Sequence, residues 1–220
     1  MSVRIFGYSE HKGSIGDQFR ARRFKFFERC LALADKPVRI LDVGGTESFW
    51  QNRGYKGKEG IHITILNLEK ECIDNEHMQF IKGDATDLSR FEDDSFDIVF
   101  SNSVIEHLYT YDNQVKMASE CQRVGIYHFI QTPNKYFFIE PHFRFPFFAQ
   151  LPKGLAYWIL TKTKLSLGQK WLPANAKATM DEIRLLDKRE FIGLFKGSKL
   201  YTERLLFLRK SFTLHNFRLN

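Results

Sequence analysis

Short apolar runs recur along the chain, and each of them ends in small or polar residues. The first run, residues 38–43, is rich in branched apolar side chains and continues directly into Gly44 and Gly45. Such a run is typical of a strand buried on both faces of a parallel sheet. Glycines at its end let the main chain approach a small ligand closely. The pattern predicts a buried strand with a cofactor site at its tip, although a tight turn without a ligand uses the same residues.

Four further runs have the same character and predict four further strands. They cover residues 61–67, 77–82, 95–101 and 126–132. Between them lie segments compatible with helices, including a basic amphipathic stretch at 17–34 and a helix for which Asp112 is the expected N-cap. This alternation of strand and helix predicts an α/β domain with a mostly parallel, doubly wound sheet.

The C-terminal part of the chain predicts a helix and a strand pair. Asp187-Lys-Arg-Glu190 has the arrangement of a capping box, and Gly197 is the expected end of the helix. Residues 199–205 and 207–215 read as two strands joined by a very short connection, so they must pair antiparallel. With the five earlier strands, the expected sheet has seven strands and an antiparallel terminal pair.

Length, cysteine content and charge narrow the class of protein. The 220 residues suit one domain, 1–220, and the three cysteines are too scattered for a disulfide framework or a metal-binding motif. No run approaches the roughly 20 apolar residues that span a bilayer, and the N-terminus carries no signal core. We therefore expect a cytoplasmic protein. A formal net charge of +7 allows an acidic partner without selecting one.

Three local sequences together resemble the class I S-adenosylmethionine-dependent methyltransferases, in particular the methyltransferase type 11-like branch that acts on small molecules. They are Ile-Leu-Asp-Val-Gly-Gly at 40–45, Gly-Asp-Ala-Thr-Asp-Leu at 83–88, and Ser-Phe-Asp-Ile-Val-Phe-Ser-Asn-Ser-Val-Ile-Glu-His-Leu at 95–108. The resemblance covers nearly the whole chain and implies a Rossmann-like fold with S-adenosylmethionine as cofactor. The first motif departs from the family's Gly-X-Gly-X-Gly, because its two glycines are adjacent and an acidic residue follows.

The resemblance also implies which residues bind the cofactor, since in a doubly wound sheet the ligand lies across the carboxyl ends of the strands. The glycine turn would lie against the methionine part, Asn67 or Glu69 would reach the ribose, and Asp84 would accept from the adenine amino group. Asn67 is the preferred ribose ligand of the two. The complete expected set is Asp42, Gly44, Gly45, Thr46, Asn67, Leu68, Asp84, Ala85, Ser101 and Asn102.

On the acceptor side, His107 is the candidate general base, because an imidazole titrates near neutrality and this one follows the fourth strand. Packing or capping of the next helix is the alternative role. Asn134, Glu140 and His142 are candidate substrate residues. Glu140 and His142 alone do not make a metal site, so no metal is expected.

Residues 133–182 form a predicted insertion after the fifth strand, unusually rich in aromatic residues, prolines and lysines. It resembles a segment found in bacterial methyltransferases of cell-surface glycan and lipid-linked metabolism. Two functional interpretations remain open, an aromatic cover over an organic acceptor and a patch that rests on an anionic membrane. A helical subdomain whose aromatics form their own core is the structural alternative.

These observations leave three hypotheses for function. The leading one is transfer of a methyl group to a small-molecule acceptor, with O-methylation of a glycan- or lipid-related substrate by in-line displacement. A nucleic-acid or protein methyltransferase is disfavoured, because Ser101-Asn-Ser-Val stands where base methylases commonly carry Asn-Pro-Pro-Tyr. The third, a catalytically silent methyltransferase-like binding protein, is motivated by the altered glycine turn.

Overall fold

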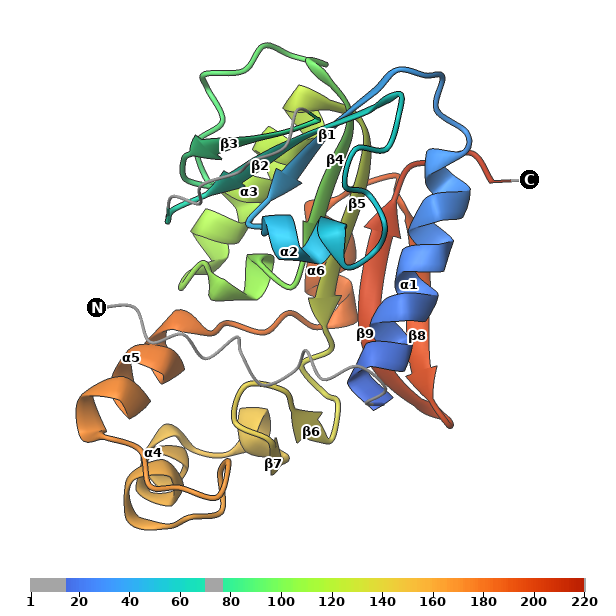
Figure 1. The fold of residues 1–220 in the computed structure, drawn as a ribbon. Helices are drawn as coiled ribbons and strands as arrows, with labels where there is room; N and C mark the ends of the chain where they lie inside the picture. Colours follow the sequence, from blue (N-terminus) through green and yellow to red (C-terminus); the bar gives the residue numbers. More distant parts are fainter. Residues whose placement is uncertain (1–14, 70–76, 220) are drawn as a thin grey trace.

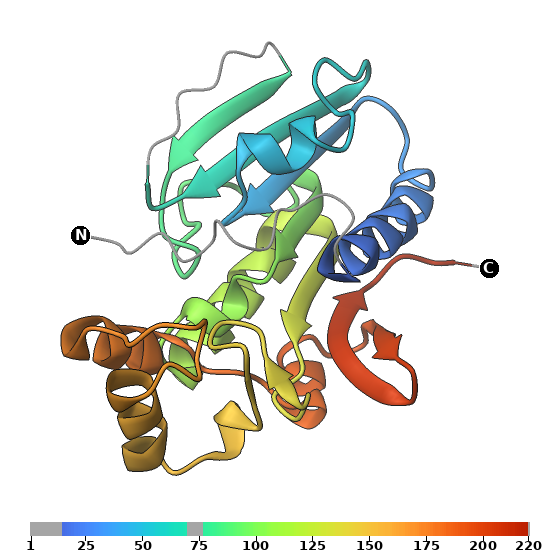
Figure 2. The same cartoon turned by 60° about the horizontal axis from the view of Figure 1, so that its bottom comes forward.

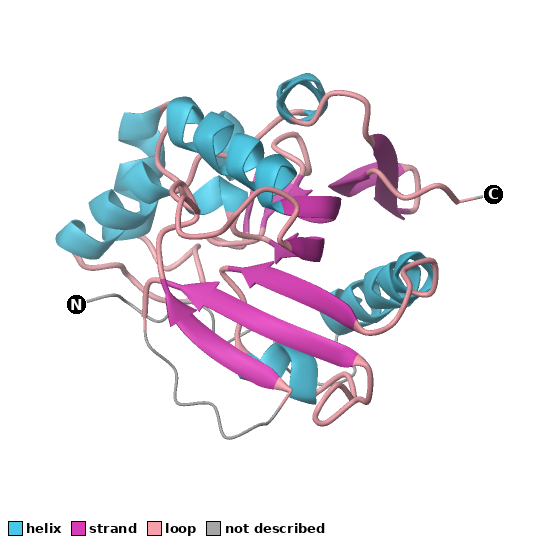
Figure 3. Cartoon of the chain, turned by 90° about the horizontal axis from the view of Figure 1, so that it is seen from above, coloured by secondary structure: helices cyan, strands magenta, loops and turns pink. Residues whose placement is uncertain are grey.

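The computed structural model describes residues 15–69 and 77–219, and these residues form a sheet with helices on both faces (Figures 1 and 3). The seven strands lie in the order β3-β2-β1-β4-β5-β9-β8. The pairs among β1 to β5 are parallel, whereas β9 is antiparallel to both of its neighbours. The predicted fold class, an α/β doubly wound sheet with an antiparallel terminal pair, is confirmed.

The elements follow the order that the apolar runs predict. The strands of the large sheet are β1 (Val38–Val43), β2 (Ile61–Asn67), β3 (Met78–Lys82), β4 (Phe96–Asn102), β5 (Gly125–Pro133), β8 (Lys199–Leu205) and β9 (Leu208–His215). The helices are α1 (Ile15–Leu31), α2 (Glu47–Gln51), α3 (Tyr111–Val124), α4 (Lys153–Lys162), α5 (Pro173–Glu182) and α6 (Lys188–Leu194). Single turns η2 (Ile105–His107) and η3 (Phe148–Gln150) and the short pair β6 (Ile139–Glu140) and β7 (Phe145–Pro146) complete the chain.

Each face of the sheet carries its own apolar core, because successive side chains of a strand point to opposite faces. On one face α1 and α2 contribute Phe27 and Trp50 to a core that contains Ile40 of β1. On the other face α3 and α6 pack over Leu41 and the neighbouring strands. Both faces of β1 are thus buried, as its continuous apolar run predicts.

The helix boundaries differ from the prediction in two places. α1 begins two residues earlier than expected and ends at Leu31. The N-cap of α3 is Thr110 and not Asp112, since the Thr110 hydroxyl accepts a hydrogen bond from the Asn113 amide while Asp112 lies inside the first turn. Both residue types cap helices well, so sequence alone did not decide between them. The capping box of Asp187 and Glu190 is present. Residues 1–14 and Cys72 lie outside the described residues.

One arginine of α1 is buried, although it lies in the stretch at 17–34 that is basic and amphipathic. Arg23 is 6% exposed, and its guanidinium donates to Glu203 of β8 at 3.0 Å. Glu203 also accepts a hydrogen bond from the Ser211 hydroxyl of β9. α1 is therefore joined to the terminal strand pair by a buried ion pair as well as by aromatic packing (Figure 1).

The chain between β5 and α6 lies beyond the carboxyl ends of the parallel strands (Figures 1 and 2). It contains β6, β7, η3, α4 and α5, and a small core of its own holds Phe143, Phe148 and Trp171. We call residues 134–186 the acceptor segment. Its two ends meet, because Asn134 and Leu186 pair in a parallel bridge.

Part of the aromatic content of the acceptor segment faces outward. Phe147 is 60% exposed, Trp158 is 54% exposed and Tyr136 is 63% exposed. The aromatic residues are thus divided between a core and a surface, and the limits 133–182 stay a prediction. Among the described residues, no helix has both the length and the apolar character needed to cross a membrane.

Candidate active site

The glycine turn at the end of β1 is shaped by two side chains of the protein itself. Gly44 has φ +80°, and a Cβ built on it would lie 2.6 Å from the Val104 methyl groups. A Cβ on Gly45 would lie 1.7 Å from Oδ2 of Asp42. The same oxygen accepts a 2.6 Å hydrogen bond from the buried Trp50 indole. Both positions therefore require glycine for packing, whether or not a ligand is bound.

Several of the predicted cofactor residues fix the strand tips to one another. The Asn67 amide donates to the Gly45 carbonyl at 3.0 Å, and the buried Ser101 hydroxyl donates to the Val43 carbonyl at 2.9 Å. The Thr46 hydroxyl caps α2 by accepting from the Phe49 amide. These three side chains hold the glycine turn in place, and the Asn67 amide group is directed to the turn.

Leu68 and Asp84 extend from the tips of β2 and β3 as an exposed shelf. Leu68 is 64% exposed, an unusual state for an apolar side chain beside a buried strand. Oδ1 of Asp84 accepts from the amide and the hydroxyl of Thr86, both at 2.8 Å, which fixes the carboxylate. Ala85 is buried beneath them. An apolar face next to a fixed acceptor suits a flat heterocycle that carries an amino group.

A small surface hollow without enclosed volume lies between the tip of β4 and the helices α1 and α2. It is lined by Arg20, Arg23, Phe24, Phe49, Phe100 and Asn102. Asn102 was predicted from the sequence, whereas the arginines were not. The only hint of these arginines in the sequence was the basic stretch at 17–34. Nothing in that stretch shows that the first turns of its helix lie over the strand tips.

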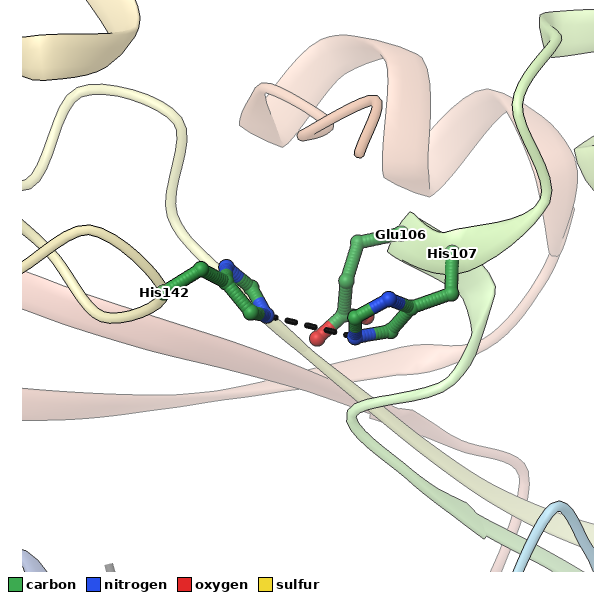
Figure 4. A group of neighbouring side chains, drawn as sticks. All are labelled: Glu106, His107 and His142. Atoms are coloured by element: carbon green, nitrogen blue, oxygen red, sulfur yellow. Dashed lines mark hydrogen bonds between the residues drawn. The ribbon is translucent and has the colours of Figure 1, made fainter. Parts of the chain in front are cut away.

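Two histidines from distant parts of the sequence meet beyond the end of β4 (Figure 4). Nε2 of His107, in η2, lies 3.2 Å from Nε2 of His142, which follows β6. The rings are nearly perpendicular, with an interplanar angle of 85°. Each Nδ1 contacts a carboxylate, His107 that of Glu182 at 2.8 Å and His142 that of Glu140 at 2.5 Å. We call these four residues the histidine pair and its carboxylates.

A third carboxylate lies beside the two rings. Glu106 is fully buried, and its Oε2 accepts a 3.0 Å hydrogen bond from the Thr132 hydroxyl at the end of β5. The Glu106 carbonyl oxygen accepts from the Arg184 amide at 2.7 Å. η2 is thereby attached both to the sheet and to the chain that leads into α6.

These carboxylates change the protonation of their neighbours. Burial disfavours charge on His142, but the hydrogen bond and the negative charge of Glu140 outweigh it, so the pKa of His142 is raised. The hydrogen bond from His107 lowers the pKa of Glu182. Perturbed titrating groups that converge at a strand end are characteristic of functional sites.

A larger hollow of about 230 Å³ opens in the acceptor segment next to the histidine pair. Glu140 belongs to both, since it lines the hollow and contacts His142. The other lining residues are mainly apolar, with Lys135, Lys153 and Arg184 among them. Asn134 does not line it, because the Asn134 amide donates to the Arg209 carbonyl and its oxygen accepts from the Tyr136 amide.

Comparison with known proteins supports the fold and the family. The sequence profile of the Methyltransferase domain family matches residues 50–126, a range that begins after the glycine turn. A search of curated protein sequences gave no match.

Similar solved structures include a suggested exported protein from Bordetella parapertussis, with 11% identity, a TM-score of 0.57 and coverage of 96% of this chain and 76% of that chain. A proposed methyltransferase from an antibiotic biosynthesis pathway of Anabaena variabilis has 15% identity and a TM-score of 0.53, with coverage of 83% and 64%. A chain of the complex between the Haloferax volcanii Trm112 methyltransferase activator and a proposed methyltransferase has 14% identity and a TM-score of 0.51, with coverage of 91% and 92%.

The residues at the strand tips fit S-adenosylmethionine. Leu68 and Asp84 offer an apolar face and an acceptor to the adenine, and the Arg20 side chain in the small hollow offers a cation to the amino-acid carboxylate. The individual contacts stay predictions. The family match over residues 50–126 and the seven-stranded sheet with its antiparallel end together support a class I S-adenosylmethionine-dependent methyltransferase.

Proposed function

We propose that this enzyme methylates a hydroxyl oxygen of a small acceptor that combines an apolar body with an anionic group, as glycan- and lipid-related intermediates do. The observation that carries the proposal is the position of Glu140, which lines the large hollow of about 230 Å³ and contacts the histidine pair. An acceptor bound in the hollow would lie next to the two imidazoles, across Glu140.

The composition of the hollow supports this class of acceptor. Phe143, Phe148 and Met180 provide apolar surface, and Lys135 and Lys153 provide positive charge at the same opening. A concave site lined mainly by apolar side chains with a few polar groups is typical of sites for small organic molecules. Positive charge beside apolar surface favours an amphiphilic anion over a neutral sugar.

The histidine pair supports transfer to oxygen, because a neutral hydroxyl must lose its proton as it attacks. Glu182 accepts from Nδ1 of His107, so the basic lone pair of the neutral ring lies on Nε2. S-adenosylmethionine supplies the methyl group as an activated sulfonium. Nε2 of His107 would take the hydroxyl proton while the acceptor segment aligns the oxygen.

Contact with a membrane surface is part of the proposal for a lipid-linked acceptor. Trp158 and Tyr157 are exposed on α4, and Lys153 and Lys162 stand at the two ends of the same helix. Aromatic side chains combined with lysines favour the interface of an anionic bilayer. We expect the fraction of protein that sediments with anionic vesicles to fall in Trp158→Ser. It should be unchanged in Leu33→Ser, a control at an exposed apolar residue just after α1 and outside the acceptor segment.

The cofactor site is tested by calorimetry with two ligands, S-adenosylhomocysteine and methylthioadenosine, the second of which lacks the amino-acid end. Asp84→Ala should weaken both about tenfold, because both carry the adenine amino group. Arg20→Gln should weaken only S-adenosylhomocysteine. Asp93→Ala, at an exposed carboxylate that pairs with Arg123, is the control and should change neither. Equal losses for both ligands in Arg20→Gln would contradict the assignment of the small hollow.

The acceptor is tested by transfer of a labelled methyl group to a panel of polyprenyl phosphates, sugar nucleotides and phenols. His107→Gln should lower kcat with a found acceptor at least about 100-fold while cofactor affinity stays unchanged. His62→Gln, at an exposed histidine near the start of β2, is the control. Transfer to an amine or thiol, with no dependence on His107, would refute O-methylation without affecting membership of the family.

A further inference from the structure

The two imidazoles of the histidine pair face each other in a way that requires a positive charge between them. Carboxylates accept hydrogen bonds, so the contacts with Glu182 and Glu140 place a proton on each Nδ1. Each neutral ring then carries its lone pair on Nε2, and the two Nε2 atoms are 3.2 Å apart. Two lone pairs at this distance repel unless a proton or a metal cation lies between them.

The separation of the Nε2 atoms suits two ligands of one metal ion. Imidazole nitrogens bind Zn²⁺ at about 2.0–2.1 Å, and two corners of such a tetrahedron are roughly 3.3 Å apart. The two rings are nearly perpendicular, and their Nε2 atoms face each other (Figure 4). The Nδ1 contacts with carboxylates are those that metal-binding histidines usually make, since they fix the ring and raise its basicity.

Glu106 supplies the third ligand atom. A carboxylate oxygen of Glu106 and one nitrogen of each histidine all lie within 4.8 Å of one another. Oε1 of this fully buried side chain has no hydrogen-bond partner within the described parts of the chain. A buried carboxylate oxygen without a partner is costly, and a cation would remove that cost.

We propose that Glu106, His107 and His142 bind a divalent transition-metal ion, with Glu140 and Glu182 as the outer carboxylates that orient the two rings. Two histidines and one carboxylate are a ligand set used for zinc and for non-haem iron, and they leave coordination positions open. Glu140 contacts His142 and also lines the large hollow, so an open position on the ion would lie next to an acceptor bound there.

The cation changes the role of His107 in the proposed reaction. A hydroxyl bound at an open position would have a lowered pKa, its O–H bond would break with the proton passing to water, and Nε2 of His107 would be a ligand and not the base. This role rests on the proposed function, whereas binding of the cation does not and is measured without any acceptor.

The test is metal uptake by the untagged full chain. Bound metal is first removed with a chelator, the chelator is removed, and Zn²⁺ or Co²⁺ is then added. We expect elemental analysis to find one Zn²⁺ per chain, and Co²⁺ to give the visible absorption of a site with nitrogen and oxygen ligands. His142→Gln and Glu106→Gln should each weaken Zn²⁺ binding at least about 100-fold, and Glu182→Gln about tenfold, the effect typical of an outer-sphere residue. Circular dichroism of each variant checks that it folds.

His62→Gln is the matched control, since it removes an exposed histidine at the start of β2. It should leave the Zn²⁺ affinity within about twofold of that of the unsubstituted protein. Absence of stoichiometric uptake, or an equal loss in His62→Gln, would overturn the proposal. A histidine NMR spectrum that shows one protonated ring shared between the two Nε2 atoms, with no metal bound, would assign the positive charge to a proton. Normal S-adenosylhomocysteine binding in the same samples would keep this outcome separate from any failure of the methyltransferase site.

Discussion

Gly45 shows how closely the strand tips are packed before any ligand is considered. A Cβ at this position would overlap the Asp42 carboxylate, which the Trp50 indole holds by its hydrogen bond. The pair of adjacent glycines is therefore explained by the protein's own structure. The departure from the family's spaced glycines follows from a turn in which Asp42 and Val104 occupy the space above the glycine backbone.

Replacement of Gly45 by Ala should lower the free energy of unfolding by about 3 kcal/mol, since the overlap is with a side chain that is itself fixed. Gly154→Ala is the matched control, because nothing lies within 4 Å of a Cβ built there, at the start of α4. We expect that change to be neutral or to stabilise by up to about 1 kcal/mol. Urea denaturation of the two variants measures the difference, and equal effects would show that the Asp42 contact is unimportant.

His128 predicts acid sensitivity at a single residue. Burial lowers the pKa of this histidine from 6.5 to about 4, with a smaller contribution from His215. Between pH 6.5 and pH 4, His128 is protonated in the unfolded chain but not in the folded chain, so the free energy of unfolding falls as the pH drops through this range. Above pH 6.5 this residue does not affect stability.

Between pH 7.5 and pH 5, His128 alone should lower the free energy of unfolding by about 2 kcal/mol. His128→Gln keeps a polar group near the Ser198 hydroxyl, which contacts Nε2 at 2.7 Å, but it cannot titrate. Its stability should fall less than that of the original chain over the same interval, as measured by urea denaturation at both pH values. A parallel loss in both proteins would place the acid sensitivity elsewhere.

At the scale of elements, a buried ion pair joins α1 to the terminal strand pair, in addition to the aromatic packing between them. Arg23 and Glu203 are 6% and 3% exposed, and breaking such a pair from one side leaves a buried charge. Arg23→Met should therefore lower the free energy of unfolding by about 3–5 kcal/mol. The double variant Arg23→Met/Glu203→Met should be less destabilised than Arg23→Met, because no charge remains. Additive losses in a double-mutant cycle would refute the coupling.

The central strands β1, β2, β4 and β5 could be predicted from sequence because they are mostly buried and are therefore largely apolar runs. The capping box of α6 was equally visible, since Asp187 and Glu190 make it by local contacts. The burial of Arg23 was not, because its partner is 180 residues away and the arginine lies among exposed basic neighbours. Helices and strands can be predicted from nearby residues, whereas an ion pair between residues far apart in the sequence can be seen only in the folded structure.

At the scale of the whole molecule, the topology decides where the site lies. The tips of β1, β2, β3 and β4 were predicted to converge because parallel strands share one carboxyl edge, and the sheet order places them side by side. The meeting of His107 and His142 has no such rule behind it. It depends on the path of the acceptor segment, whose turns around β6 and β7 the sequence pattern does not specify.

The charge of the large hollow gives a prediction at this scale. Lys153→Glu should raise the KM of an anionic acceptor about tenfold, leaving S-adenosylhomocysteine affinity unchanged, because Lys153 lines the acceptor hollow and not the small one. Lys162→Glu makes the same charge reversal at the other end of α4, outside the lining, and is the control. Steady-state kinetics at two salt concentrations would measure both. Equal KM increases would show that overall charge and not the hollow governs recognition.

The bridge between Asn134 and Leu186 makes the acceptor segment a closed excursion from the sheet. Because its ends adjoin, a short linker could replace the excursion without moving β5 or α6 apart. Such a segment can be exchanged between proteins as one cassette, carrying the hollow together with Glu140 and His142. The residues proposed to bind the methyl donor would stay behind unchanged. On the proposed function, acceptor choice and donor binding would therefore lie in separate units of the chain, and a change of acceptor would need no change in the sheet.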